Sequence, residues 1–334
     1  MLILTGCTKE FIMEQPRDSS GQKPETVAEA RIAIPDQIRF TKQGLYPESV
    51  AFDKLNNRFL VSSISEGTIG AVTYNGIYKP FIQDTALHST IGLEIDEARK
   101  QVLVVIGDLF GNVAQLGIYD LQTGSRIRIV DLAALRQGTI HLADDVAIDP
   151  QGNKYITDAK SPIVYKIDPN GHASVLFENE LYAEPPGFPF YWVGFNGIVY
   201  NTNGFLIVGF FTEGKLLKIP VNDPDSYSEI KLDVPLASPD GLLLSKDGKQ
   251  LIVVDARYLG EDAEIVRMVS DDKWNSAKRI ESFPTGLVSP TTATSNGKDV
   301  FVMYSYLHDI FFGSEFPQKE FTIQRIPFEN AKEF

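Results

Sequence analysis

The sequence predicts an all-β protein, and within that class a six-bladed β-propeller with four-stranded antiparallel blades. Three observations lead to this fold. A seven-residue pattern occurs six times, a run of β-branched and aromatic residues follows each copy, and no long helical period interrupts them. The 334 residues, 43% of them hydrophobic and 22% charged, have the balance of a globular chain rather than of a disordered or fibrous one. A different all-β repeat is the alternative architecture.

The first 29 residues are set apart from the repeat. They contain Leu-Thr-Gly-Cys ending at Cys7, which is similar to the lipobox where bacterial lipoproteins are acylated, but the basic region and most of the apolar region of a full signal are missing. We expect a truncated lipoprotein-type signal or an accidental match, followed by a flexible polar tether. A true lipobox predicts a periplasmic or outer-membrane lipoprotein that meets the membrane only through a lipid on Cys7. Without it, the protein is expected in the cytoplasm.

Residues 30–334 are expected to form a single propeller domain. The six copies of the pattern are residues 47–53, 90–96, 143–149, 195–201, 239–245 and 290–296. Their second positions lie 43 to 53 residues apart, which is the size of a propeller blade.

A turn rich in Asn, Asp, Gly or Lys follows each copy and leads into a second strand-like run. These second runs are residues 58–62, 101–105, 154–157, 205–208, 250–254 and 300–303. Most units continue with a third run, such as residues 163–167, and several with a fourth. Short strands at hairpin spacing close most naturally into a ring, because radial repetition protects the sheet edges. Residues 31–35 are predicted to supply the outer strand of the last blade.

The second position of each copy lies at one end of the central channel if the first strand of each blade is the innermost one. Around the ring this position is occupied by Glu48, Ile91, Asp144, Asn196, Asp240 and Thr291. Three carboxylates and one amide oxygen then converge, and the charges repel one another unless a cation neutralises them. Oxygen ligands of this kind suit Ca²⁺, with another divalent cation as an alternative. Each residue taken alone also suits a strand-start turn.

The charged and metal-ligating residues narrow the function classes further. With 31 basic and 44 acidic residues the net charge is −13, so the chain is not expected to bind nucleic acid. One cysteine and four histidines leave no cysteine-built zinc site. Four other aspartates do not occupy a second position of the repeat, and they are predicted to make hydrogen bonds in turns and between blades: Asp53, Asp96, Asp145 and Asp149.

From residue 46 onward the chain resembles a known family. The segments around Glu48, Asp144, Asn196 and Asp240 are similar to those of the regucalcin/gluconolactonase (senescence marker protein, LRE-like) family. Its six-bladed superfamily includes paraoxonases, drug-responsive lactonases and strictosidine-synthase-like proteins. The resemblance implies a divalent cation, usually Ca²⁺, on Glu48, Asn196 and Asp240. The Asp-Asp pair that begins at Asp144 is more like that of the drug-responsive lactonases, where this Asp is implicated in catalysis.

One position departs from the family pattern. The gluconolactonases place an Arg two residues before the third-blade ligand to hold sugar hydroxyls, whereas Leu142 stands here. A polyhydroxylated sugar lactone is therefore not the expected substrate.

The resulting hypothesis is a Ca²⁺-dependent hydrolase of lactones or related esters, a carboxylic ester hydrolase. The cation would polarise the substrate carbonyl for attack by water. Asp144 would be a fourth ligand or the general base, and His141, or alternatively His308, a further proton carrier.

The predicted substrate pocket is aromatic. Residues 185–192 combine prolines with four aromatic side chains just before Asn196, as an apolar wall over a cation requires. The predicted lining residues are Phe188, Phe190, Tyr191, Trp192 and Tyr304. A hydrophobic plug between blades is the alternative role for this segment.

Two other functions stay open on the sequence alone. One is a non-catalytic, metal-stabilised propeller that binds a small molecule or a protein. The other is a strictosidine-synthase-like condensation, which depends on a glutamate in a late blade, and neither Glu261 nor Glu264 is assigned that role.

Overall fold

A computed structural model describes residues 34–108, 112–188, 191–257, 263–313, 317–329 and 334. The chain divides into two compact units, Met1–Ile34 and Pro35–Phe334, and every strand described here belongs to the second. Cys7, the predicted tether and Phe190 lie outside the described residues. No helix in the described part of the chain has both the length and the apolar character needed to cross a membrane.

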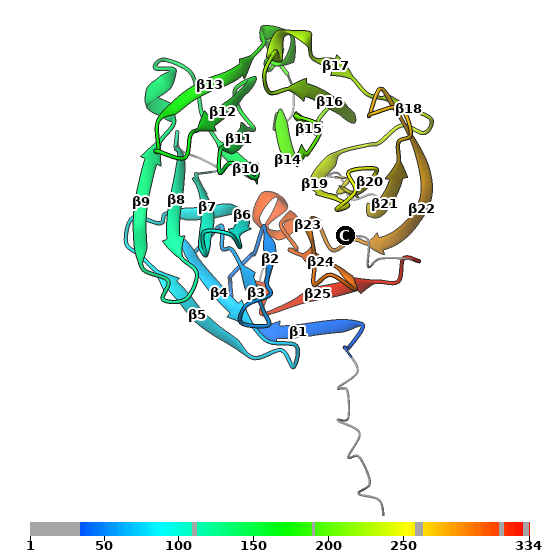
Figure 1. The fold of residues 1–334 in the computed structure, drawn as a ribbon. Coiled ribbons are helices and arrows are strands. Elements are labelled where there is room, and N and C mark those ends of the chain that lie inside the picture. Colours follow the sequence, from blue (N-terminus) through cyan, green and yellow to red (C-terminus); the bar gives the residue numbers. More distant parts are fainter. Residues whose placement is uncertain (1–33, 109–111, 189–190, 258–262, 314–316, 330–333) are drawn as a thin grey trace, which may run out of the picture. The chain divides into compact units, whose positions relative to one another are not determined.

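The second unit is a six-bladed β-propeller, as predicted (Figure 1). In the first three blades the strands run outward in chain order: β2 (Val50–Asp53), β3 (Arg58–Val61), β4 (Thr68–Val72) and β5 (Tyr78–Gln83); β6 (Ser89–Asp96), β7 (Gln101–Gly107), β8 (Ala114–Asp120) and β9 (Arg126–Asp131); β10 (Ala143–Ile148), β11 (Lys154–Asp158), β12 (Ile163–Ile167) and β13 (Ala173–Glu178). The fourth and fifth blades are β14 (Phe195–Asn201), β15 (Phe205–Phe210), β16 (Lys215–Pro220) and β17 (Ser228–Glu229); β19 (Pro239–Leu244), β20 (Gln250–Asp255), β21 (Ala263–Val269) and β22 (Ser276–Gly286).

The sixth blade joins the two ends of the propeller domain. It contains β23 (Pro290–Ser295), β24 (Val300–Tyr304) and β25 (Glu320–Ile326), and its outer strand is β1 (Gln37–Thr41), which pairs antiparallel with β25. An N-terminal strand thus closes the ring, but at residues 37–41, so the prediction of residues 31–35 for this strand is wrong. The alternating exposure along β1 explains the choice, because Ile38 and Phe40 are buried while their neighbours face solvent.

Few other elements interrupt the blades. The described residues include three 3₁₀ turns, Ala133–Leu135, Glu180–Tyr182 and Pro224–Ser226, and one short helix, α1 (His308–Phe312), which is orange near the centre of Figure 1. The fifth blade departs from the four-stranded plan, since β18 (Lys231–Leu232) adds a short parallel strand outside β22.

The hydrophobic core lies between neighbouring blades. Leu60 of the first blade and Val104 of the second belong to one fully buried cluster, and similar clusters join each later pair of blades up to the sixth. The first and last blades meet through Phe59 and Phe301, whose rings pack edge to face with centroids 4.9 Å apart. This packing holds the six innermost strands around a common axis.

Candidate functional site at one mouth of the central channel

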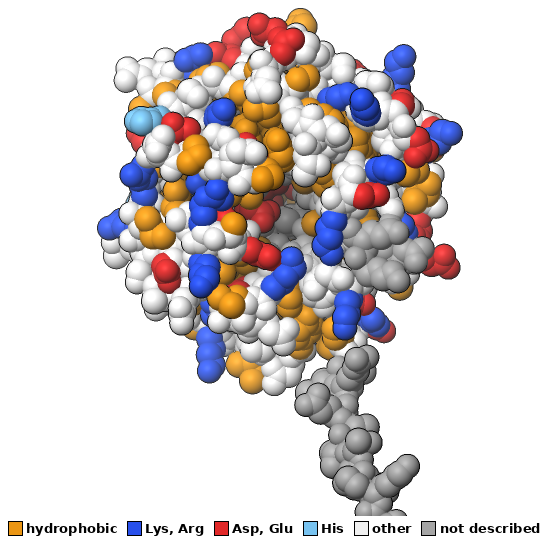
Figure 2. All heavy atoms as spheres, in the orientation of Figure 1, with side chains coloured by type: hydrophobic (Ala, Val, Ile, Leu, Met, Phe, Trp, Pro, Cys, Tyr) orange, Lys and Arg blue, Asp and Glu red, His pale blue; other side chains and the backbone are white. Residues whose placement is uncertain are grey.

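The six second positions of the repeat come together in one cavity. It has a volume of about 430 Å³ and is lined by Glu48, Ile91, Asp144, Asn196, Asp240 and Thr291, one residue from each blade. The four candidate oxygen ligands among them are each only 7–8% exposed. Figure 2 shows the ring from its opposite face, where acidic and basic side chains surround a central hollow.

Irregular strand starts position these side chains. In five blades the register of the innermost strand shifts at the second position, for example between Phe195 and Ile198, where Asn196 lies. A β-bulge re-aims a side chain without ending the strand. The bulges therefore bring the second positions into the cavity while the rest of each strand stays in its sheet.

The residue directly after each second position fixes the spacing between neighbouring blades. A Cβ at Gly197 would collide with the carbonyl oxygen of Asp240 in the next blade, and one at Gly241 would lie 2.5 Å from the carbonyl oxygen of Thr291. Where this position is not glycine its side chain bonds to the next blade: Asp145 accepts from the backbone N–H of Ile198 at 3.1 Å. Sequence reasoning missed this role of glycine, although the repeated X-Gly pattern was its signal.

The acidic side chains at this mouth lie close enough to influence one another's ionisation. Burial, together with Asp144 and Asp240, raises the pKa of Glu48 well above its usual range. Burial and Asp145 raise the pKa of Asp144, and burial and Asp144 raise that of Asp240. The metal-free site therefore favours protonated carboxyls.

The donor set fits a divalent cation. Asp144 Oδ2 and Asp240 Oδ1 are buried without a hydrogen-bond partner among the described residues, so each has an oxygen lone pair available to a metal. As the side chains lie, the described residues hold no group of three His, Cys, Asp or Glu already gathered around one point as a metal site. Glu48, Asp144 and Asp240 could supply carboxylate oxygens to a cation in this cavity, and Asn196 an amide oxygen.

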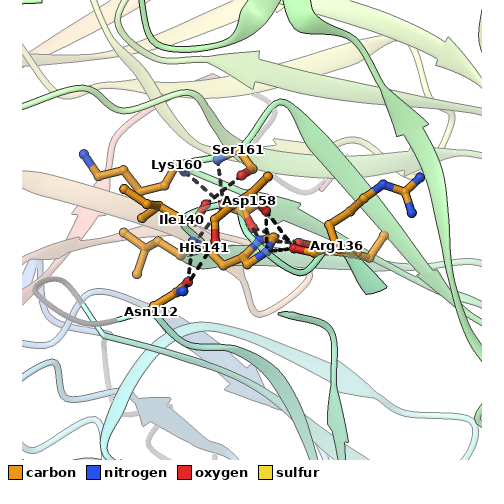
Figure 3. Close-up of polar contacts among 10 residues, drawn as sticks. Asn112, Arg136, Ile140, His141, Asp158, Lys160 and Ser161 are labelled. Carbon is orange, nitrogen blue, oxygen red and sulfur yellow. Dashed lines mark hydrogen bonds and ion pairs between the residues drawn. The ribbon is translucent and has the colours of Figure 1, made fainter. Parts of the chain in front are cut away.

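His141 does not line this cavity. Its ring is buried in a polar network with Asp158 (Figure 3), where Nδ1 lies 2.9 Å from Asp158 Oδ2 and Nε2 lies 2.8 Å from the carbonyl oxygen of Arg136. The hydrogen bond with Asp158 raises the pKa of His141, against the opposing effect of burial. Both ring nitrogens of His141 are therefore engaged away from the cavity.

The network fixes the segment that leads to Asp144. Asp158 also accepts from the backbone N–H of Leu142 at 3.0 Å and of Ser161 at 2.9 Å. This anchors Leu142, whose side chain lines the cavity two residues before Asp144.

The predicted aromatic wall is only partly correct. Tyr191 lines the cavity and packs against Phe311, with ring centroids 5.7 Å apart. Phe188 and Trp192 do not line it; they pack edge to face, 5.0 Å between centroids, and fill space between blades. Tyr304 is buried in the core between the fifth and sixth blades. Side chains on opposite sides of one strand or loop cannot both reach the cavity.

Other residues complete the wall. Besides the six second positions and those already named, the cavity is lined by Ile64, Ala159, Val193, Phe211, Ala256, Arg257, Ala263, Gly286, Leu287, Ser289, Pro290, Leu307, His308 and Phe312. Most of these are apolar, so a ligand would meet acidic oxygens at the axis and hydrocarbon around it. Of the two glutamates considered for a condensation, Glu264 is paired with Arg279 at 2.7 Å and Glu261 lies outside the described residues.

Comparisons with known proteins support the fold. No family model and no curated protein sequence matches the chain. Among solved structures, the major Malassezia sympodialis allergen Mala s 1 is similar at TM-score 0.71 and 16% identity, over 90% of this chain and 98% of the other. A luciferin-regenerating enzyme is similar at TM-score 0.59 and 12% identity, over 89% and 99% of the two chains.

A gluconolactonase from Xanthomonas campestris is also similar, at TM-score 0.58 and 12% identity, over 87% of this chain and 89% of its own. At these identities the likeness concerns the fold. The chain is thus a six-bladed β-propeller with an acidic, apolar-walled cavity at one mouth of its channel, and gluconolactonase-like propellers are among its structural neighbours.

Proposed function

We propose that the protein is a Ca²⁺-dependent hydrolase of lactones or related esters, acting in the 430 Å³ cavity. The observation that supports this most is the convergence of three coupled carboxyl groups and one amide, with two buried carboxylate oxygens lacking partners in the described structure. The gluconolactonase neighbour agrees with this class of reaction.

Glu48, Asn196 and Asp240 would hold the cation. When bound, it would polarise a substrate carbonyl and stabilise the oxyanion that forms on attack. Asp144, whose Oδ2 is buried without a hydrogen-bond partner among the described residues, would accept a proton from the attacking water. Addition of water breaks the acyl carbon–oxygen bond, and a lactone leaves as its hydroxy acid.

The wall of the cavity favours an apolar substrate. Leu142 and Phe311 offer a hydrocarbon and a ring face rather than hydrogen bonds. A hydroxyl group placed against them would lose hydration without gaining a hydrogen bond, whereas an alkyl or aryl group there would gain from burial. We therefore expect aliphatic or aromatic lactones to be preferred over sugar lactones.

The test is hydrolysis of a panel of aliphatic, aromatic and sugar lactones by metal-stripped protein, before and after Ca²⁺ is restored. We expect turnover that returns with Ca²⁺ and is greatest on the apolar members. If no lactone is hydrolysed while Ca²⁺ is still bound, the hydrolase is contradicted. That result would favour a metal-stabilised propeller that binds a small molecule or a protein.

A further inference from the structure

Ser289 occupies an unusual backbone position beside the cavity. Its φ is 45°, in the left-handed region that a non-glycine residue seldom adopts, and it immediately precedes β23. The conformation is held in place because the carbonyl of Ser289 accepts from the backbone N–H of Ser305 at 3.1 Å. Such local strain often accompanies a functional role.

The hydroxyl of Ser289 contacts both the backbone and the ring of His308. The backbone N–H of His308 donates to Ser289 Oγ at 3.3 Å, so the serine proton is free to point elsewhere. Oγ lies 2.8 Å from His308 Nδ1, which can accept that proton. The other ring nitrogen, Nε2, lies 3.4 Å from Asp309 Oδ1. This arrangement favours the tautomer with its proton on Nε2 and a basic Nδ1 facing the serine.

The pair shares its cavity with Asp144 and the other candidate ligands. Ser289 and His308 are the only serine and histidine among the described residues that line it. The neighbouring hydroxyl of Thr291 is already used, because it donates to the carbonyl oxygen of Glu48. A serine hydrogen-bonded to a histidine, whose second nitrogen faces a carboxylate, is the arrangement of an activated nucleophile.

We propose that Ser289 and His308 form a nucleophile–base pair that carries an acyl-enzyme intermediate. The inference rests on the ester or lactone hydrolysis proposed above and adds a covalent step to it. Ser289 Oγ bonds to the acyl carbon and its proton passes to His308 Nδ1. The ring or ester C–O bond then breaks, and the leaving oxygen takes the proton from His308. Water activated by Asp144 hydrolyses the acyl-serine and returns a proton to Ser289.

The experiment uses an alkyl fluorophosphonate, which reports the nucleophile without requiring a known substrate. Ser289 Oγ would displace fluoride from phosphorus, and the adduct is located by intact mass and peptide mapping. The variants are Ser289→Ala, Ser289→Gly and His308→Asn, with Ser282→Ala as the matched control. Glycine suits the φ of 45°, asparagine retains a hydrogen-bond acceptor without a base, and Ser282 is an exposed serine on β22. Thermal melts check that each variant is folded.

We expect one adduct, on Ser289, in the wild type and in Ser282→Ala, none there in the two Ser289 variants, and labelling at least tenfold slower in His308→Asn. No adduct on wild-type Ser289 would overturn the pair. Lactone turnover that survives in folded Ser289→Gly would also overturn it, while leaving the proposed hydrolase intact. An adduct on Ser289 without turnover of any lactone would support the pair and count against the proposed substrates.

Discussion

The two mouths of the central channel are built from opposite ends of the same six strands, yet they differ in chemistry. The near mouth, lined by the strand starts, holds the acidic cavity of about 430 Å³. The far mouth, a cavity of about 320 Å³, is lined by later residues of the same strands, among them Glu94 and Asp145. Its rim includes Lys54 and Glu97, which pair at 2.7 Å with both side chains about half exposed.

Adjacent aspartates show what separates the mouths. Asp145 belongs to the far mouth and accepts from the backbone N–H groups of Val146 at 2.8 Å and Ile198 at 3.1 Å. Asp144 belongs to the near mouth, and its Oδ2 has no partner among the described residues. A buried carboxylate that bonds to backbone amides stabilises the fold, whereas one left without partners is available to a ligand.

The largest expected effect is on catalytic activity, and it should differ between variants of Asp144 and of Asp145. Asp144→Asn should lower turnover by about 10³-fold, roughly 4 kcal/mol in the barrier, because the base is lost. Asp145→Asn should leave turnover within a few-fold, because residue 145 faces the far mouth and an asparagine oxygen can still accept from the backbone N–H of Ile198. Steady-state kinetics and thermal melts on both variants check this. Equal loss of activity in the two would mean that the mouths are not functionally distinct.

Gly197→Ala should cost about 3 kcal/mol of folding free energy, the order expected for a steric clash in a packed interior. The new Cβ would collide with the backbone carbonyl of Asp240 and push the fourth and fifth blades apart at the near mouth. Gly194→Ala is the control, because its Cβ would come no closer than 3.3 Å to another atom. Urea denaturation measures both, and similar midpoints would show that the blades are not held by this contact.

Calcium should stabilise the protein only through the near mouth. At a concentration 100 times the Kd, a ligand that binds the native state alone adds about 2.7 kcal/mol. The Glu48→Gln, Asp240→Asn double variant should lose this gain, measured as the Ca²⁺-induced rise in Tm. Glu94→Gln at the far mouth should keep it. Tight Ca²⁺ binding by the double variant would show that the second positions are not the ligands.

The smallest expected effect is the part of the pH dependence of stability that Glu94 contributes at the far mouth. Burial raises the pKa of Glu94 to about 7 from an ordinary value near 4.5. Between these two pH values the folded protein therefore binds more protons than the unfolded chain does. Its free energy of unfolding falls as the pH rises from about 4.5 to about 7. Glu94→Gln should remove part of that fall and be more stable than wild type above pH 7 by about 2 kcal/mol.

Urea midpoints from pH 4 to pH 8 measure the effect of Glu94. The control is Glu97→Gln, since Glu97 lies at the same mouth but its side chain is 55% exposed. An unchanged pH profile in Glu94→Gln would mean that another group controls this interval.

Most of the fold was predictable because its signals are local and repeated. The predicted second and third strands agree with β3, β7 and β12 to within two residues at either end. The shared position of Glu48, Asp144, Asn196 and Asp240 in the repeat was also sufficient to predict that they meet, because closure of the ring repeats one geometry six times.

Side-chain direction in the loops was not predictable in this way. His141 and Leu142 are adjacent, yet one turns into a polar network behind the strand and the other into the cavity. Tyr191 and Trp192 divide in the same manner between cavity and core. A loop has no fixed period, so the contacts of each blade with its neighbour decide which of two adjacent residues faces the ligand.

The sequence by itself determined the number of blades, the order of their strands and the acidic residues at the axis, since these follow from a repeat and its period. Only the tertiary structure decided that residues 37–41 close the ring, that Gly197 sets the distance between blades, and that Ser289 meets His308. These three depend on contacts between segments distant in the chain or on a local backbone angle, and neither leaves a periodic pattern in the sequence.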